Sequence, residues 1–169
     1  MIGISKALVS SGSAMRLCDI LTVDRIRVDG DAQIRDKAAA IRVLSELLSS
    51  AVGVEQQTLE RLLMERERLQ STGIGDGVAI PHTSVDTAPG QAAALVLCRH
   101  GVPFEAIDGA DVNIIFGVVG PKRATGEHLK TLARISRLLR DPETRSALIH
   151  SPDPAAAWRL IEARDAGAR

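Results

Sequence analysis

The chain has 169 residues, of which 45% are hydrophobic, and this suits one globular domain rather than a disordered segment. Aromatic residues make up only 2%, too few for the stacking platforms that bind single-stranded nucleic acid. The 21 basic and 21 acidic residues balance, so no overall charge draws the protein to nucleic acid or to an anionic membrane.

Cysteine use and hydropathy indicate the compartment. Cys18 and Cys98 lack the spacing of a metal or redox motif, so we expect two reduced thiols in the core. No apolar run approaches the ~18 residues of a membrane span, and the N-terminus has no signal-peptide core. We therefore expect a cytoplasmic protein without membrane insertion. Residues 1–16, rich in Ser and Gly, are expected to form a flexible tail before a single domain at 17–165.

Two helices are predicted in the first third of the chain. Asp31 is the expected N-cap of a helix with apolar residues at helical spacing from Ile34 to Leu48, and Gly53 ends it. A second helix is expected from about Glu55, with a charged stretch at 65–68. Its inward-facing residues are predicted to be Leu59, Leu62, Leu63 and Leu69.

The middle of the chain reads as strands. Short β-branched or aliphatic runs at 78–80, 93–97 and 112–119 are separated by Gly, Pro and Asp, and Pro121 closes the last of them.

Helical spacing returns at 125–140, where one stripe holds Leu129, Leu132, Ile135, Ser136 and Leu139. Asp141-Pro142 ends that helix, a short turn runs through Leu148, and a last helix follows residues 151–154. These elements predict one α/β domain with helices packed on a sheet.

The run at 71–82, STGIGDGVAIPH, is the segment most suggestive of chemistry. Its three alternate glycines free the backbone for close turns and for approach to a ligand. Pro81 then ends the ladder of a short strand and leaves His82 at the strand end. A histidine held there can carry a proton, a metal or a phosphoryl group, or it is a turn residue bonded to a nearby carbonyl.

Several chemistries are disfavoured by spacing. Gly73-x-Gly75-x-Gly77 matches neither common nucleotide-binding loop, and it follows a helix and precedes a strand, the reverse of their order. Metal binding by His82 and His128 would need a third ligand, which no close spacing supplies, so we expect no metal. The G-x-S-x-G turn of serine hydrolases is absent. What remains is covalent catalysis in which an imidazole is the transient carrier.

His128 has two interpretations that the sequence leaves open. It lies near the start of the helix that follows the strand at 112–119, and it is either a half-buried histidine at the edge of the core or a partner of His82. In the second case, a helix N-terminus and a second imidazole would stabilise an anion. Solvent exposure is enough to explain His100 and His150.

The glycine run carries a family resemblance. Ser71-Thr72-Gly73-Ile74-Gly75 with Val78-Ala79-Ile80-Pro81-His82 resembles the active-site signature of phosphotransferase-system enzyme IIA domains of the fructose/mannitol type, and most nearly the stand-alone nitrogen-regulatory IIA proteins. Three further motifs support it over about 17–163. They are Arg66-Glu67-Arg68, the segment at 102–109 (VPFEAIDG) and the histidine-bearing helix that begins His128-Leu129-Lys130.

The resemblance implies a mixed central β-sheet flanked by helices and a phosphoryl carrier without a cofactor. His82 would accept a phosphoryl group from the phosphohistidine of an HPr-type protein, His128 would stabilise the phosphoryl oxygens, and Arg66 would neutralise charge. Thr83 replaces the family's usual Gly and brings a hydroxyl within reach of the imidazole or the phosphoryl group, while Gln70 replaces another Gly. The supporting loop residues are Ser71, Thr72, Gly73, Gly75, Gly77 and Thr83.

A regulatory protein and a transport component of this family differ in the proteins to which they bind. The sequence shows no IIB-like cysteine loop and no HPr-like domain, which favours the nitrogen-regulatory branch, where the phosphorylation state controls binding to target proteins. The alternatives are a sugar-transport IIA component that passes phosphate to a IIB cysteine, and a protein-binding module that is never phosphorylated. An oligomer is compatible with the sequence.

Overall fold

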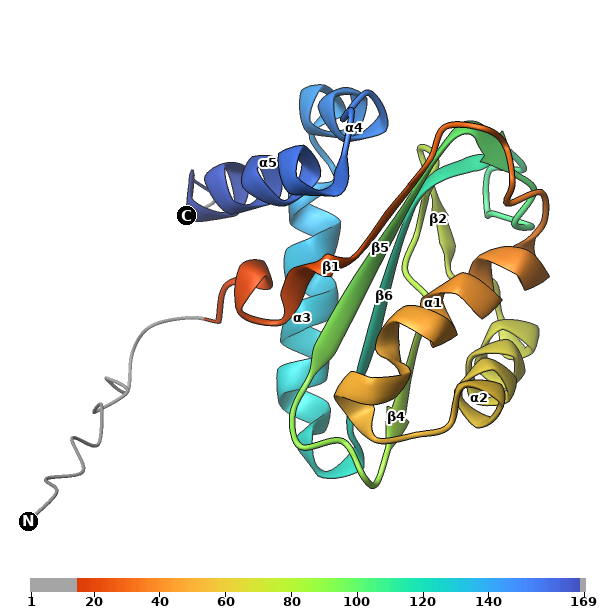
Figure 1. Ribbon diagram of the computed structural model, residues 1–169, viewed down its shortest axis with the longest axis vertical. Helices are drawn as coiled ribbons and strands as arrows, with labels where there is room; N and C mark the ends of the chain where they lie inside the picture. The colour runs from red at the N-terminus through yellow and green to blue at the C-terminus, as the bar shows by residue number, and fades with distance from the viewer. Residues whose placement is uncertain (1–14, 168–169) are drawn as a thin grey trace, which may run out of the picture.

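A mixed six-stranded sheet lies between two layers of helices in the computed structural model, which describes residues 15–167 (Figure 1). The strand order is β1-β5-β6-β3-β2, and β4 pairs with β6 on the same side as β3. β5 and β6 are antiparallel, whereas β1 is parallel to β5, and β3 and β4 are parallel to β6. The strands are β1 (Leu21–Asp29), β2 (Gly73–Gly75), β3 (Val78–Ala79), β4 (His82–Val85), β5 (Ala92–Val102) and β6 (Val112–Pro121).

The helices divide between the two faces of this sheet (Figure 1). α1 (Lys37–Val52) and α2 (Gln56–Leu69) cover one face, while α3 (Thr125–Leu138), α4 (Pro142–Ile149) and α5 (Pro154–Gly167) cover the other. Two short 3-10 turns, η1 (Leu17–Asp19) and η2 (Lys122–Ala124), precede β1 and α3. The prediction of a single α/β domain with a mixed sheet flanked by helices is therefore confirmed.

The two central strands, β5 and β6, contribute side chains to both layers of the core. Side chains of successive strand residues point to opposite faces, so Ala94 and Val96 of β5 pack toward α1 and α2, while Ala93 and Leu95 pack toward α3 and α5. Because β5 and β6 are covered on both faces, their sequences are apolar almost without interruption.

The first helix begins later than predicted. Asp36, not Asp31, is its N-cap, and the Asp36 carboxylate accepts a hydrogen bond of 2.8 Å from the backbone N–H of Ala39. The buried carboxylate of Asp29 accepts hydrogen bonds from the backbone N–H groups of Gln33 and Ile34, which holds the preceding segment out of helical geometry. Ile34 still reaches the core, but from a loop. Gly53 ends α1 as predicted, at a φ of 67°.

Two leucines that the helical pattern places on apolar stripes are exposed. Leu69 at the end of α2 is 83% exposed and Leu129 on α3 is 61% exposed, so both predictions are wrong. The turn predicted before Leu148 is instead the helix α4, because Asp141 caps the backbone N–H of Thr144 and Pro142 begins the first turn.

The N-terminal part of the domain contains a strand that no pattern predicts. β1 is an edge strand with a bulge between Leu21 and Ile26, and most of its residues are at least partly exposed, which hides the usual alternation. The predicted tail at 1–16 lies outside the described residues except for Met15 and Arg16, of which Met15 packs against the core on the α3 side.

Cys18 is half-buried, Cys98 is buried, and neither forms a disulfide. Burial raises the pKa of the Cys98 thiol to about 12, so this side chain behaves as an apolar core residue. No helix within residues 15–167 is both long and apolar enough to cross a membrane.

Candidate functional site

His82 is the first residue of β4, which continues along β6 where β3 stops. β3 pairs with Ile114 and Ile115, and β4 resumes the pairing with His82 opposite Val118. Pro81 interrupts the strand between them, although its carbonyl oxygen still accepts a hydrogen bond of 3.0 Å from the backbone N–H of Val118. His82 therefore starts a strand rather than ending one, and the side chain of Val118, opposite it, packs in the core on the α3 face.

One ring nitrogen of His82 is engaged by the main chain. Nδ1 lies 2.7 Å from the carbonyl oxygen of Ile80. A carbonyl oxygen only accepts, so Nδ1 carries the proton and Nε2 keeps its lone pair. Burial lowers the pKa of His82, against the opposing effect of this hydrogen bond, and the charge of Arg66 lowers it further. The ring is thus neutral and nucleophilic at Nε2 near neutral pH.

His128, in the first turns of α3, lies beside His82. The two ring centroids are 5.6 Å apart and the ring planes are tilted by 52°. Burial lowers the pKa of His128, and the neighbouring His82 lowers it further. Of the two interpretations that the sequence leaves open, the geometry favours the one in which His128 is a partner of His82.

A hollow of about 250 Å³ opens at His82. α3 contributes Leu132 and Ser136, one and two turns beyond His128. α2 contributes Arg66, whose guanidinium donates a hydrogen bond of 3.1 Å to the carbonyl oxygen of Gln70. The other lining residues are Gln70, Ser71, Thr72, Ile74 and Ile80. The hollow thus combines a neutral imidazole with a guanidinium, an arrangement suited to an anionic group that is transferred to nitrogen.

The predicted glycine loop is a β-hairpin. β2 and β3 pair antiparallel, with Gly75 opposite Val78, and Asp76 and Gly77 form the two-residue connection. Both have positive φ, 56° and 75°, as the mirror-image turns that join tight hairpins require. The Asp-Gly pair was the available sequence signal for this hairpin.

Gly73 is needed for a close approach, not for its φ. A Cβ at this position would lie 2.7 Å from Cβ and 2.8 Å from Cα of Ala106. The backbone N–H of Ile107 also donates a 3.0 Å hydrogen bond to the carbonyl oxygen of Gly73. The hairpin is therefore held against the segment that follows β5.

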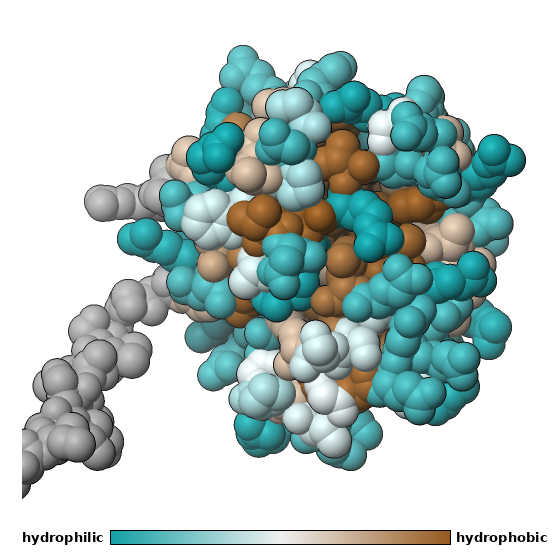
Figure 2. All heavy atoms as spheres, in the orientation of Figure 1, coloured by the Kyte–Doolittle hydropathy of each residue, from teal (hydrophilic) through white to brown (hydrophobic). Residues whose placement is uncertain are grey.

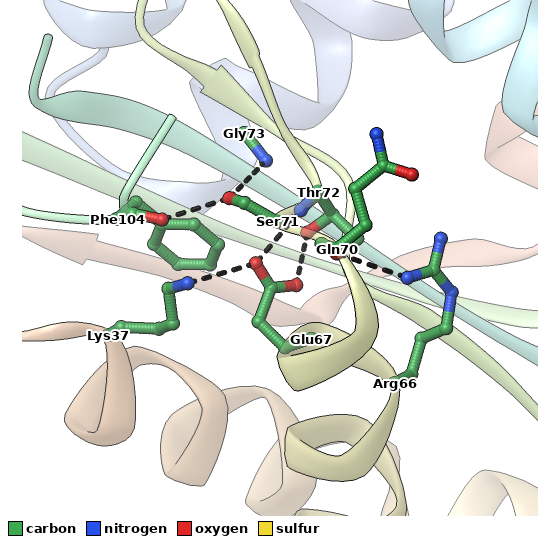
Figure 3. Close-up of polar contacts among 8 residues, drawn as sticks. All are labelled: Lys37, Arg66, Glu67, Gln70, Ser71, Thr72, Gly73 and Phe104. Carbon is green, nitrogen blue, oxygen red and sulfur yellow. Dashed lines mark hydrogen bonds and ion pairs between the residues drawn. The ribbon is translucent and has the colours of Figure 1, made fainter. Parts of the chain in front are cut away.

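The hydroxyls of Ser71 and Thr72 hold the floor of the hollow in place (Figure 3). Ser71 Oγ donates to the carbonyl oxygen of Phe104 and accepts from the backbone N–H of Gly73. Both the backbone N–H and the hydroxyl of Thr72 donate to the carboxylate of Glu67, at 2.8 and 2.6 Å. These two side chains therefore support the loop instead of presenting free donors to a ligand.

Glu67 is the anchor of this arrangement (Figure 3). Its carboxylate is nearly fully buried and lies 3.2 Å from the ammonium of Lys37, at the start of α1. Lys37 also lies 4.9 Å from the centroid of the Phe104 ring. The buried charge of Glu67 is thus compensated by one cation and two hydrogen bonds. These contacts tie α1, α2 and the hairpin together. No local pattern points to Lys37, because it lies 30 residues before Glu67.

Three predicted supporting residues are not at the imidazole. Gly75 and Gly77 lie at the far end of the hairpin, beside Asp108 and Asn113. Thr83 pairs with Val119, whose side chain packs on the α1 face, so its hydroxyl points to the opposite side of the sheet from His82. The expected contact between Thr83 and the imidazole is therefore not formed.

A larger groove, of about 480 Å³, lies between β1 and α1. Several of its charged groups are already engaged: Arg27 pairs with Glu46, Arg42 pairs with Glu60, and the carboxylate of Asp29 accepts hydrogen bonds from two backbone N–H groups. In Figure 2, on the face that includes α1, apolar side chains gather in the middle and hydrophilic ones around them. Within residues 15–167, no group of three or more His, Cys, Asp or Glu side chains is arranged to hold a metal ion.

Known proteins match both the sequence and the fold. The family described as "Phosphoenolpyruvate-dependent sugar phosphotransferase system, EIIA 2" matches residues 19–164. The nitrogen regulatory protein of Pseudomonas aeruginosa is 32% identical over 149 residues, covering 87% of this chain and 95% of that protein. The fructose-specific EIIABC component of Bacillus subtilis is 28% identical over 152 residues, which cover 89% of this chain but only 24% of that protein.

A solved structure agrees. The crystal structure of nitrogen regulatory protein IIA-Ntr from Neisseria meningitidis superposes with a TM-score of 0.79 at 29% identity, covering 85% of this chain and 97% of that one. The family match spans nearly the whole described domain, including the hairpin, His82 and the helix that carries His128. The chain therefore belongs to the enzyme IIA family of the phosphoenolpyruvate-dependent phosphotransferase system, of the fructose/mannitol type.

Proposed function

We propose that this protein is a cytoplasmic phosphoryl carrier in which Nε2 of His82 accepts a phosphoryl group from the phosphohistidine of an HPr-type protein. The observation that carries the proposal is the 2.7 Å hydrogen bond between Nδ1 and the carbonyl oxygen of Ile80, which leaves Nε2 as the free nucleophile in a hollow that also holds Arg66. No cofactor takes part in this reaction.

The transfer exchanges one nitrogen–phosphorus bond for another. The Nε2 lone pair forms the new bond to phosphorus, and the bond to the donor imidazole breaks with its electron pair returning to the donor nitrogen. The two imidazoles are chemically similar, so the protein contributes mainly position and compensation of negative charge. Arg66 provides the compensating cation, and His128 provides a second ring that is able to gain a proton.

The surroundings of the hollow suit a protein partner. Two of the large apolar side chains that are exposed in the described residues lie at its rim, Leu69 and Ile74. Ile74 lines the hollow, and Leu69 directly precedes the lining residue Gln70. Exposed apolar side chains that gather at one place mark surfaces that dock another protein. This accounts for the exposure of Leu69, which the helical pattern does not predict.

The principal role we infer is regulatory, with the phosphorylation state controlling association with target proteins. Relatives named nitrogen regulatory proteins match over most of their length, which supports this role. The alternative is a transport component that passes the group to a IIB cysteine, and the likeness to part of a fructose-specific EIIABC component supports it.

Radiolabelling tests the carrier function. We expect the protein to gain acid-labile label when it is incubated with labelled phosphoenolpyruvate, enzyme I and the cognate HPr-type protein, and we expect His82→Ala to gain none. Absence of label on the native protein, with all three reagents active, would leave a protein-binding module as the function. Label that persists in His82→Ala would place the acceptor elsewhere.

A second assay separates regulation from transport. The labelled protein is mixed with a purified fructose-type IIB domain and with a variant of that domain that lacks its cysteine. Retention of label on the IIA protein supports the regulatory role, whereas rapid passage to the intact IIB domain alone supports transport.

A further inference from the structure

Two buried polar atoms have no hydrogen-bond partner among the described residues. They are Nδ1 of His128 and Oε1 of Gln91, the residue that directly precedes β5. Buried polar atoms are nearly always paired, because an unpaired one loses its hydration without compensation. Nothing in the phosphoryl-transfer scheme above uses Gln91.

The two side chains border the same space. Gly120 of β6 lies opposite Ser84, two residues beyond the pairing of Val118 with His82, and so on the same face of the sheet as His82. A Cβ on Gly120 would lie 3.0 Å from Cγ of Gln91 and 3.5 Å from Nδ1 of His128. The missing side chain of Gly120 therefore leaves one space that is bordered by the Gln91 side chain and the His128 ring.

We propose that Gln91 is a positioning residue for His128, with Oε1 of Gln91 accepting a hydrogen bond from Nδ1–H of His128. This inference rests on the proposed function of His82. The bond satisfies both buried atoms and requires only rotation of a flexible side chain. It fixes the His128 tautomer with the proton on Nδ1, which leaves Nε2 as the nitrogen that responds to a group on His82.

The consequence appears when His82 carries a phosphoryl group. His128 then takes one proton from solvent onto Nε2, and this N–H donates toward a phosphoryl oxygen while Nδ1–H remains bound to Gln91. A carbonyl acceptor stabilises the doubly protonated ring more than the neutral one, because the hydrogen bond becomes charge-assisted. Gln91 thereby favours the phosphorylated protein without touching the phosphoryl group.

Other charged groups do not provide this acceptor. The elements that pack most closely against α3 are β6, η1 and η2, while α5 contacts it through the ion pair of Asp165 with Arg134 and β4 contacts it through His82. Asp19 of η1 and Lys122 and Arg123 of η2 are all exposed, and β6 carries no charged residue. Among residues 15–167, His82 is the neighbour whose charge lowers the pKa of His128. The amide of Gln91 is therefore the acceptor that the surroundings offer to Nδ1.

Nitrogen-15 NMR of the histidine rings tests the proposal. In the unphosphorylated wild-type protein we expect His128 in the Nδ1–H tautomer. In Gln91→Met, which keeps the length of the side chain but removes the acceptor, we expect the tautomer to shift toward Nε2–H and the pKa of His128 to fall by about half to one unit, the size of one hydrogen bond. Gln91→Glu should raise that pKa. Gln33→Met, at an exposed position in the groove by β1, serves as the matched control and should change neither.

Phosphorylation provides the second readout. We expect Gln91→Met to shift the phosphoryl equilibrium with the HPr-type donor by about threefold to tenfold toward the donor, in keeping with the same hydrogen bond. A wild-type His128 in the Nε2–H tautomer, or an unchanged tautomer and pKa in Gln91→Met, would overturn the assignment.

The tautomer is measured without phosphorylation, so it is independent of the proposed function. Suppose that His128 shows the Nδ1–H tautomer but that the protein takes up no label at His82. Gln91 would then still be the partner of His128, and only the proposed carrier function would be wrong. If Gln91→Met does not fold, the wild-type tautomer and the Gln91→Glu pKa still decide the assignment.

Discussion

The hollow at His82 and the groove between β1 and α1 differ in a way that size does not predict. The groove has about 480 Å³ against about 250 Å³ for the hollow. In the groove, however, Arg27 pairs with Glu46, and the Asp29 carboxylate is bound by the main chain. In the hollow, the main chain binds one nitrogen of His82 and leaves the other free.

The availability of a reactive atom therefore identifies the site better than volume does. In the hollow, buried polar groups such as Glu67 form the support, while His82 and Arg66 face the open space. In the groove, the paired ions lie at the surface, where such pairs contribute little. Substituting matched residues in the two regions should therefore give unequal effects.

The largest difference in the free energy of unfolding is expected between substitutions of two glutamates, one at each region. Glu67→Gln removes the ion pair with Lys37 and leaves the ammonium without its counterion, so the free energy of unfolding should fall by about 3 kcal/mol. Glu46→Gln breaks an exposed pair and should reduce it by less than about 1 kcal/mol. Urea denaturation of the two variants measures both values. Equal losses would show that the buried ion pair is not the anchor we describe.

Substitutions of two arginines should differ in their effect on the rate of phosphoryl uptake. Arg66→Gln removes the guanidinium from the hollow, and we expect phosphoryl uptake to slow by about 10- to 100-fold, the equivalent of one charge-assisted hydrogen bond. Arg27→Gln, in the groove, should remain within about twofold of the wild type. Rapid-quench labelling with the HPr-type donor measures both rates. A slow Arg27→Gln variant would mean that the groove takes part in the transfer.

Two glycines test the packing of the hairpin. Gly73→Ala forces a Cβ to within 2.7 Å of Ala106, so we expect a loss of about 1–3 kcal/mol in the free energy of unfolding and slower phosphoryl uptake. Gly90→Ala meets no atom within 4 Å and has no positive φ, and its effect should stay within about 0.5 kcal/mol. A neutral Gly73→Ala would indicate that the hairpin has room to move away from Ala106.

The smallest expected effect is the change in the free energy of unfolding with pH. The pKa values of His82 and His128 are lowered in the folded protein, so below about pH 6.5 the unfolded chain binds protons that the folded protein does not. The free energy of unfolding should therefore change little between pH 7.5 and about 6.5 and fall as the pH decreases further toward the lowered values. Urea denaturation between pH 7.5 and 5.5 measures this slope.

His82→Asn should reduce the pH slope, because the variant has one fewer titrating group. Arg66→Gln should also reduce it, because Arg66 helps to lower the pKa of His82. An unchanged slope in both variants would contradict the assigned causes.

Sequence patterns predicted much of the fold because its core follows local periodicity. The apolar runs at β5 and β6 and the leucine spacing in α1 and α2 reflect burial of whole elements, which repeats every two or about 3.6 residues. The hydrophobic patterns gave wrong or no predictions where an element is only partly buried. β1 is an edge strand with mostly exposed residues, and Leu69 and Leu129 occupy apolar positions of helices at points where no other element covers them.

The sequence by itself determined the family, the α/β layers and the segment that carries His82, because motifs and periodicity are local properties of the chain. Only the tertiary structure decided which side chains meet at that segment. His128 comes beside His82, Lys37 comes beside Glu67, and Gln91 shares a space with His128, whereas Thr83 turns away from its own neighbour in sequence. These contacts depend on strand register and on the packing of helices across the sheet, and no local pattern encodes either.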